Sequence, residues 1–147
     1  MSSTGEPISP CGDTWLSAAP GERQAIRVDS RTTGGAYAII ESVAEPGCAV
    51  PTHLHRNEDE HFLVISGHYR IAIGSELIDA MPGAHIMVPR NSPHSWRNIA
   101  QVESRLLAIL IPGGFEQIAY EVAHTPAEQI RELAARYGCE ILGPPVA

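Results

Sequence analysis

Apolar and polar positions divide the middle of the chain into many short segments. Between residues 24 and 111 these segments are rich in apolar and β-branched residues, and turns such as Gly34-Gly35, Ser66-Gly67 and Pro82-Gly83 separate them. Short runs bounded by turn residues are typical of β-strands. The predicted strands cover residues 24–29, 36–43, 60–65, 69–73, 84–89, 94–99 and 105–111. So many short strands predict an all-β sandwich or barrel.

The last part of the chain has a helical pattern instead. Residues Thr125 to Glu128 read Thr-Pro-Ala-Glu, which predicts a capping box with proline at the first helical position. Gly138 then ends a run of apolar residues at helical spacing, which comprises Ile130, Leu133, Ala134 and Tyr137. We expect this apolar stripe to pack on the outside of the chain's own barrel. A dimer contact and a lid over the barrel mouth are the alternatives.

These patterns predict three parts of one domain. The first 20 residues are rich in proline, glycine and serine, so we interpret residues 1–20 as an N-terminal arm. Residues 21–112 hold the predicted strands and form the barrel. Residues 113–147 form a C-terminal helical extension that packs on the barrel or on a dimer partner. A chain of 147 residues is long enough to fold as one domain without disulfide or metal staples.

Composition excludes some partners. The net charge is −7, from 17 acidic and 10 basic residues, and no basic stripe is present, so we expect neither a nucleic-acid nor an anionic-membrane partner. No apolar stretch reaches the length of a membrane span, and the first residues lack the pattern of a signal peptide. The three cysteines, Cys11, Cys48 and Cys139, are odd in number and scattered, which predicts free thiols. We therefore expect a soluble, cytoplasmic protein.

Histidine and glutamate occur at spacings that suit a metal site. Gly47 is followed after five residues by His53, then by His55, Glu60 and Gly67. Side chains two residues apart in a strand lie on one face, so His53 and His55 can both point inward, and Glu60 arrives from the returning strand. Imidazole and carboxylate ligands together suit divalent first-row metals.

A second run of spacings supplies another imidazole. It contains His94 and consists of Gly83, Pro89, Asn91, His94 and Asn98. The two runs are similar to the paired signature motifs of the cupin superfamily, and the chain resembles a small single-domain bacterial cupin. This resemblance implies a double-stranded β-helix, also called a jelly roll, with a C-terminal helical tail. It also implies a homodimer, which protects the edge strands of a small jelly roll.

The resemblance also implies one divalent transition metal per chain, which could be iron, manganese, nickel, cobalt, copper or zinc. The implied ligands are His53, His55, Glu60 and His94. Family spacing selects Glu60, with Glu58 as the alternative carboxylate. Asn91 stands where the family usually has glycine, and because asparagine tolerates left-handed backbone, we expect the turn to be kept.

Further segments resemble bacterial cupins of the quercetin dioxygenase-like group. They are residues 33–37, 89–98, 112–116 and 136–145. This resemblance implies oxygenolytic ring opening of a flavonol, whose hydroxyl binds the metal and is deprotonated by Glu60. Our leading hypothesis is therefore a metal-dependent dioxygenase acting on a small enolisable, flavonol-like, aromatic or polyketide-like compound. The alternatives are a non-redox isomerase, cyclase or lyase that uses the metal as a Lewis acid, and a ligand-binding or sensing cupin without turnover.

The predicted strand register suggests which residues line a substrate pocket. Phe62 and Val64 share the face of Glu60, while Trp96 and Asn98 share that of His94. Tyr37 and Met87 are further candidates, on strands whose inward register is ambiguous. These residues suit a small aromatic or apolar substrate, and the alternative for each is simple filling of the barrel core.

Overall fold

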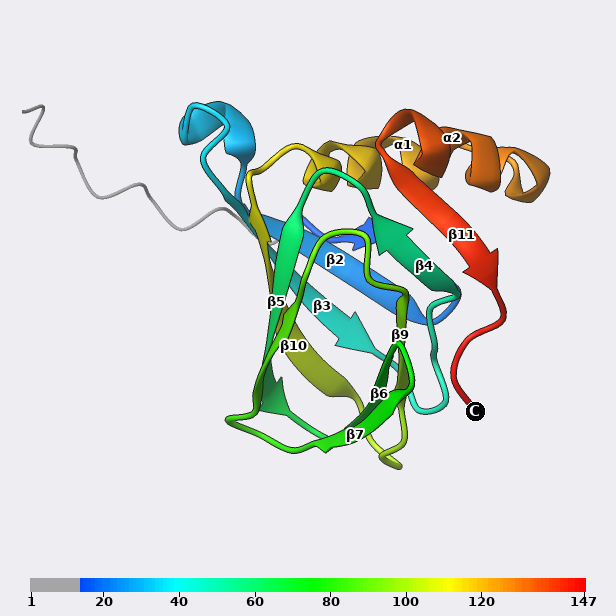
Figure 1. Cartoon of the computed structure of the whole chain (residues 1–147). Coiled ribbons are helices and arrows are strands. Elements are labelled where there is room, and N and C mark those ends of the chain that lie inside the picture. Colours follow the sequence, from blue (N-terminus) through cyan, green and yellow to red (C-terminus); the bar gives the residue numbers. More distant parts are fainter. Residues whose placement is uncertain (1–13) are drawn as a thin grey trace, which may run out of the picture.

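Two antiparallel sheets curve around a shared interior (Figure 1). The computed structural model of the chain describes residues 14–147, so Cys11 and most of the predicted N-terminal arm lie outside the described residues. In order across the sheet, the first sheet contains β1 (Leu16–Ser17), β2 (Glu22–Val28), β3 (Ala38–Ala44), β10 (Ser104–Ile111), β5 (Asp59–Ser66) and β8 (His85–Val88). The second contains β11 (Cys139–Gly143), β4 (Thr52–His55), β9 (His94–Asn98), β6 (Tyr69–Ile73) and β7 (Glu76–Ala80). This architecture confirms the predicted double-stranded β-helix.

All seven predicted strands are present, with ends that differ from the prediction by at most two residues. The prediction did not include β1, β4, β7 or β11, although it placed His53 and His55 in extended backbone. Of these four, β1, β7 and β11 lie at sheet edges. The strand β1 is only two residues long, which is too short to show an alternation of apolar and polar residues.

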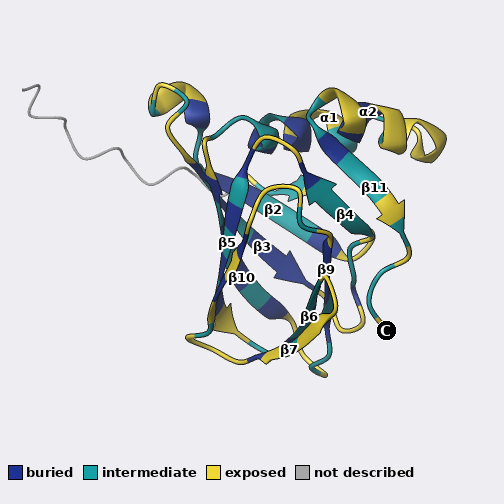
Figure 2. Cartoon of the chain, viewed as in Figure 1, coloured by how far each residue is buried: buried dark blue, intermediate teal, exposed yellow. Residues whose placement is uncertain are grey.

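The inner faces of the two sheets form the main core. Phe62 and Val64 of β5, Leu106 of β10 and Ile71 of β6 are all buried. Figure 2 shows the buried residues along the inside of the barrel and the exposed residues at loops and on the helices. Trp96 packs edge-on against the fully buried Tyr69, with 5.4 Å between the ring centroids. The two sheets therefore share one interior, into which the candidate ligands also point.

Short helices follow the last barrel strand and run across one end of the barrel (Figure 1). They are η2 (Phe115–Ile118), α1 (Ala119–Val122), η3 (Ala127–Gln129) and α2 (Ile130–Arg136). The buried Leu133 and Ala134 of α2 pack with Ile118 and Cys139 of the same chain. The apolar stripe thus packs against η2 and β11 of the same chain. No helix within residues 14–147 is long and apolar enough to cross a membrane.

The predicted capping box is wrong, although the helix that it was meant to start is present. The Thr125 hydroxyl donates to the backbone oxygen of Glu121, at 2.7 Å. Thr125 therefore satisfies a carbonyl at the end of α1, a short helix that the sequence pattern did not predict. The turn η3 precedes α2, and neither of them has a side-chain cap. Gly138 does end α2, with φ of +73°.

Candidate metal centre

Three strands bring the four candidate ligands together. The histidines His53 and His55 lie on β4, Glu60 on β5 and His94 on β9, and each offers one ligand atom within 4.8 Å of the other three. His53 and His94 are directly paired across β4 and β9, while Glu60 reaches across from the other sheet. Ligand atoms around one first-row ion lie up to about 4.4 Å apart, so small adjustments suffice to bind it.

The turn at Asn91 holds the two motifs together. Asn91 has φ of +65°, so the left-handed conformation expected of asparagine at this position is confirmed. Its backbone N–H donates to the carbonyl of His55 at 2.7 Å. The loop before β9 is thereby attached to the strand that supplies two ligands, and this contact sets the position of His94 relative to His55.

Backbone carbonyls orient two of the imidazole rings. Nδ1 of His53 lies 2.7 Å from the carbonyl oxygen of Pro51, and Nδ1 of His94 lies 3.0 Å from that of Ser92. A proton on each Nδ1 satisfies these carbonyls and leaves Nε2 with a lone pair. Nε2 of His94 faces Oε1 of Glu60 at 3.0 Å. With Nε2 deprotonated, the imidazole lone pair and the carboxylate oxygen can bind one cation together, so this donor set fits a metal ion.

The electrostatics favour the protonation states that metal binding requires at His53 and Glu60, and oppose the one that it requires at His55. Burial lowers the pKa of His53 to about 3, assisted by neighbouring His94 and His55, so this ring is neutral. Burial also acts to lower the pKa of His55, but the adjacent Glu60 outweighs it and the pKa is raised. Burial opposes ionisation of Glu60, yet the two histidines hold its pKa well below the usual range. Glu60 is therefore a carboxylate, as a ligand must be.

Glu58, the alternative carboxylate, does not join the ligand cluster. The four grouped residues include Glu60 only, although Glu58 is also buried and its charge acts on His55. Oε1 of Glu58 and Nδ1 of His55 are both buried without a hydrogen-bond partner among the described residues. Burial raises the pKa of Glu58, whereas the pKa of Glu60 is lowered, so the two carboxyl groups differ in their tendency to ionise. The structure thus selects Glu60, in agreement with the spacing of the motif.

A cavity of about 430 Å³ opens beside the metal centre, which is a suitable size for a small molecule. Barrel residues such as Phe62, Trp96 and Leu106 form part of its wall. Residues 18–20, before β2, form a second part. The C-terminal extension supplies the third, with Phe115, Ile118, Ala119, Val122 and Ile130. The C-terminal extension is therefore part of the cavity wall.

Only part of the predicted pocket lines this cavity. Phe62 and Trp96 do, whereas Val64 is buried in the core and Asn98 bonds nearby backbone. The predictions for Tyr37 and Met87 are wrong because these side chains are 41% and 45% exposed. Met87 pairs with His61 on the outward side of β5 and β8. On β8 the inward side chains are those of Ile86 and Val88. The register that would point Met87 inward is therefore wrong by one residue.

The sequence analysis missed a polar group on the cavity wall, which comprises Glu22, Gln24 and Ser42. Ser42 follows Ile40 on the inward side of a predicted strand. A hydroxyl among apolar inward positions could have indicated a polar group in the cavity wall. Glu22 and Gln24 gave no comparable signal, because they lie at the uncertain start of their strand. They become neighbours of Ser42 only through the pairing of β2 with β3.

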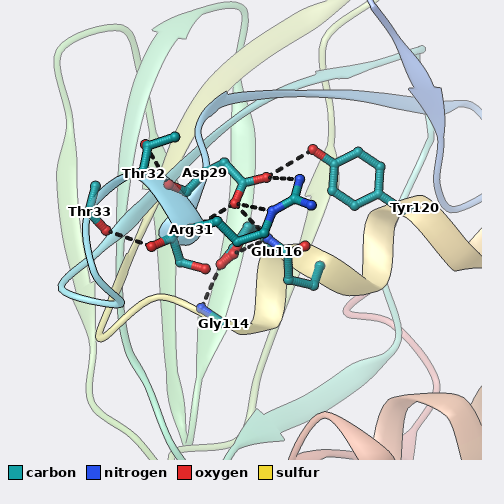
Figure 3. A network of polar contacts seen from close by, with 9 residues as sticks. Asp29, Arg31, Thr32, Thr33, Gly114, Glu116 and Tyr120 are labelled. Atoms are coloured by element: carbon teal, nitrogen blue, oxygen red, sulfur yellow. Dashed lines mark hydrogen bonds and ion pairs between the residues drawn. The ribbon is translucent and has the colours of Figure 1, made fainter.

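A network of polar contacts attaches the C-terminal wall to the barrel (Figure 3). Asp29 lies between β2 and η1 (Ser30–Thr32) and accepts hydrogen bonds from Arg31, Gln117 and Tyr120. Gln117 belongs to η2 and Tyr120 to α1, so one carboxylate holds both cavity-lining helices. Figure 3 shows the contacts of the Asp29 carboxylate with Arg31 and with the Tyr120 hydroxyl. The neighbouring Glu116 is fully buried and accepts from the N–H of Gly114.

Known proteins share both the motif region and the fold. The family model described as "Cupin domain" matches residues 41–110. Quercetin 2,3-dioxygenase of Bacillus subtilis (strain 168) is 26% identical over 101 residues, which are 69% of this chain and 29% of that protein. The chain thus spans less than a third of that relative's length.

Solved structures extend the likeness to the whole barrel. KdgF from Halomonas sp. superposes with a TM-score of 0.64 at 16% identity, over 71% of this chain and 90% of that one. A predicted oxalate decarboxylase from Thermotoga maritima gives a TM-score of 0.61 at 18% identity, over 67% and 90% of the two chains. Such identities establish the fold alone. Together with the domain match and the two motifs, they show that this chain is a member of the cupin superfamily.

Proposed function

We propose that this protein is a metal-dependent dioxygenase that acts on a small enolisable, flavonol-like, aromatic or polyketide-like compound. The observation that carries this proposal is the cluster of three histidines and Glu60 beside a largely apolar cavity. Such a cavity suits an aromatic enol better than a sugar or a phosphate, which need many polar partners. The likeness to the Bacillus subtilis quercetin dioxygenase over 69% of the chain supports the same reaction class.

His53, His55, Glu60 and His94 would hold the metal. When bound, a divalent transition ion supplies a Lewis acid for an enol oxygen and redox chemistry with dioxygen. Three neutral imidazoles and one carboxylate neutralise only one of its two charges, so the site still attracts an enolate. Four protein ligands also leave positions open if the ion is six-coordinate, which is typical of catalytic rather than structural sites.

Glu60 has a second task in this proposal. Its Oε1 faces the histidines, so Oε2 is the oxygen that can take the proton of an incoming hydroxyl. The apolar side chains of Phe62, Trp96 and Phe115 surround the substrate and exclude water. Phe115 packs edge-on against His55, with 4.4 Å between the ring centroids. The C-terminal extension therefore contacts both the substrate space and a ligand.

The first test is elemental analysis of protein purified without chelators or nickel affinity chromatography. We expect close to one iron, manganese, nickel, cobalt or copper ion per chain, and oxygen uptake with a flavonol. Glu60→Gln and His94→Ala should lose at least about tenfold in metal affinity, and with it the oxygen uptake. His124→Ala is the matched control, because this histidine is exposed and lies outside the ligand cluster, and it should retain both.

Other outcomes of this test favour other functions. Zinc in the site, with turnover that needs no oxygen, would favour a non-redox isomerase, cyclase or lyase. A protein that binds no metal in any preparation would favour a ligand-binding cupin. A redox-active metal with no oxygen uptake for any enol tested would contradict the dioxygenase proposal.

A further inference from the structure

The cavity has a second polar group away from the metal ligands. Of the described residues that line it, Glu60 and Glu22 are the two carboxylic acids. Glu22 lies at the start of β2 and is only 7% exposed. Gln24 of the same strand and Ser42 of β3 are directly paired in the sheet and both contact Glu22. Backbone pairing therefore builds this cluster into the wall.

The cluster lies at a distance from the metal ligands along the barrel. Glu60, Leu110 and Ala38 form one row across β5, β10 and β3. Ser42 is four residues further along β3, which is roughly 13 Å at the rise of an extended strand. A molecule that contacts both groups must therefore be elongated, and the wall between the two groups is apolar, with Ile40, Phe62, Leu106 and Ala108.

The hydrogen bonds of Glu22 fall mainly on one oxygen. Oε2 accepts from the Ser42 hydroxyl at 2.6 Å and from the Gln24 amide at 3.1 Å. Oε1 has a single contact, with the backbone N–H of Ala19 at 3.4 Å, which is at the limit of a hydrogen bond. Oε1 is therefore the oxygen that is left to a ligand, and Ala19 also lines the cavity.

The surroundings of Glu22 favour the neutral acid. Burial raises the pKa of Glu22, and the negative charge of Glu60 raises it further against the hydrogen bonds of Ser42 and Gln24. Because two donors already occupy Oε2, the proton of the neutral carboxyl belongs on Oε1. A buried O–H without a good acceptor is costly, so a ligand oxygen that accepts it gains binding energy.

We propose that Glu22 binds the end of the substrate that is remote from the metal, by donating a hydrogen bond from Oε1 to a hydroxyl or carbonyl oxygen. This inference rests on the proposed function and narrows the substrate class. The substrate is an elongated, largely apolar enol, with an oxygen pair for the metal at one end and an uncharged oxygen at the other. Glu22 is thus a specificity-determining residue.

The test uses a pair of flavonols and the zinc-loaded protein without oxygen, so that binding is measured without turnover. One probe is 3-hydroxyflavone, which has only the metal-binding oxygen pair. The other is its 4′-hydroxy derivative, which adds a phenol at the far end. We expect wild type to bind the second about tenfold more tightly, which corresponds to one hydrogen bond.

Two substitutions of Glu22 distinguish hydrogen-bond donation to the ligand from an effect of the charge of the carboxylate. Glu22→Gln keeps a donor of the same shape, so it should keep the preference for the 4′-hydroxy compound to within about threefold. Glu22→Leu removes the donor and should abolish this preference, while the affinity for 3-hydroxyflavone stays nearly constant. Glu76→Leu, at an exposed position of β7 outside the cavity, is the matched control and should behave as wild type.

A spectroscopic measurement covers the case in which Glu22→Leu does not fold. In wild type, the infrared band of the protonated Glu22 carboxyl, identified by its absence in Glu22→Gln, should shift when the 4′-hydroxy compound binds and not when 3-hydroxyflavone binds. Equal shifts, equal affinities of wild type for the two probes, or a preference that Glu22→Leu leaves unchanged would each overturn the inference. So would a failure of wild type to bind either flavonol, although oxygen uptake with a shorter enol would still leave the proposed function in place.

Discussion

Gly67 and Asn98 belong to different sequence motifs, yet both contact the fully buried Ser104. The Ser104 hydroxyl donates to Oδ1 of Asn98 at 2.7 Å and accepts from the N–H of His68 at 3.0 Å. Gly67 has φ of +85°, and a Cβ atom added there would lie 1.9 Å from Oγ of Ser104. Both the backbone conformation and the close approach of Ser104 therefore require glycine at this position.

This arrangement predicts a large loss of stability for Gly67→Ala. The methyl group must displace Ser104 and with it the contact to Asn98, so we expect the free energy of unfolding to fall by about 3 kcal/mol or more. Gly47→Ala is the matched control, since Gly47 has φ of +79° but no atom within 4 Å of an added Cβ. It should lose only about 1 kcal/mol. Urea unfolding measures both values, and equal losses would contradict this account.

Two of the four candidate ligands were predictable because their geometry is local, whereas Glu60 and His94 followed from the resemblance to the cupin motifs. His53 and His55 are two residues apart on one strand, and period two places both on one face whatever the rest of the chain does. Met87 and Tyr37 failed because an inward position depends on register, which one residue of shift reverses. Glu22 could not be found at all, since its role depends on the pairing of strands rather than on spacing.

Asp29 connects the short helices to the barrel through hydrogen bonds that its ionised carboxylate accepts. The guanidinium of Arg31 is the main cause that holds the pKa of Asp29 well below its usual range, with further hydrogen bonds from Tyr120 and Gln117. A carboxyl with a depressed pKa stabilises the fold above the pKa that it has in the unfolded chain, about 3.9. This contribution is lost as the pH falls through and below that value.

We therefore expect Asp29→Asn to be less stable than wild type by about 1 kcal/mol at pH 7. The difference should shrink as the pH falls from about 5 to about 2, because Asp29 of the unfolded wild-type chain then takes up a proton, which favours unfolding of wild type and not of Asp29→Asn. Asp79→Asn is the control, since Asp79 makes only an exposed ion pair with Arg70 at 3.8 Å. Thermal unfolding across this pH range measures the effect, and a difference that is constant with pH would refute it.

Secondary structure was predictable where a segment is long enough to carry a clear apolar period. The central strands and α2 carry clear periodicities because their environment repeats along the element. By contrast, η2, α1 and η3 are only three or four residues long, too short to show a period. Their positions follow from contacts such as Asp29 with Tyr120, which are far apart in sequence.

The outer face of the first sheet is unusually apolar for a surface. Leu63, Ile65, Met87, Leu107 and Ile109 point away from the interior on β5, β8 and β10, and Ile65 and Met87 are each 45% exposed. The half-exposed His61 and the exposed His85 lie on the same face, with their rings stacked and 2.7 Å between Nδ1 and Nε2. We propose that two copies of the chain pair through this face, because pairing covers it and the edge strand β8 together.

This proposal predicts a dimer at micromolar concentration by light scattering. Met87→Glu places a charge in the centre of the pairing face and should shift the molar mass to that of a monomer. Leu77→Glu is the control, because Leu77 is 63% exposed on β7 of the other sheet, and it should remain dimeric. A wild-type protein that is monomeric, or a dimer that Met87→Glu leaves intact, would contradict the proposed face.

The three-part wall of the cavity has a consequence for how this fold can acquire new specificity. The metal ligands all come from residues 53–94, whereas residues 18–24 and 115–141 supply much of the surface that a substrate meets. Chemistry and a large part of recognition are thus encoded in separate stretches of the gene. Recombination that exchanges the two outer stretches can change which molecule is accepted and leave the inherited metal site intact.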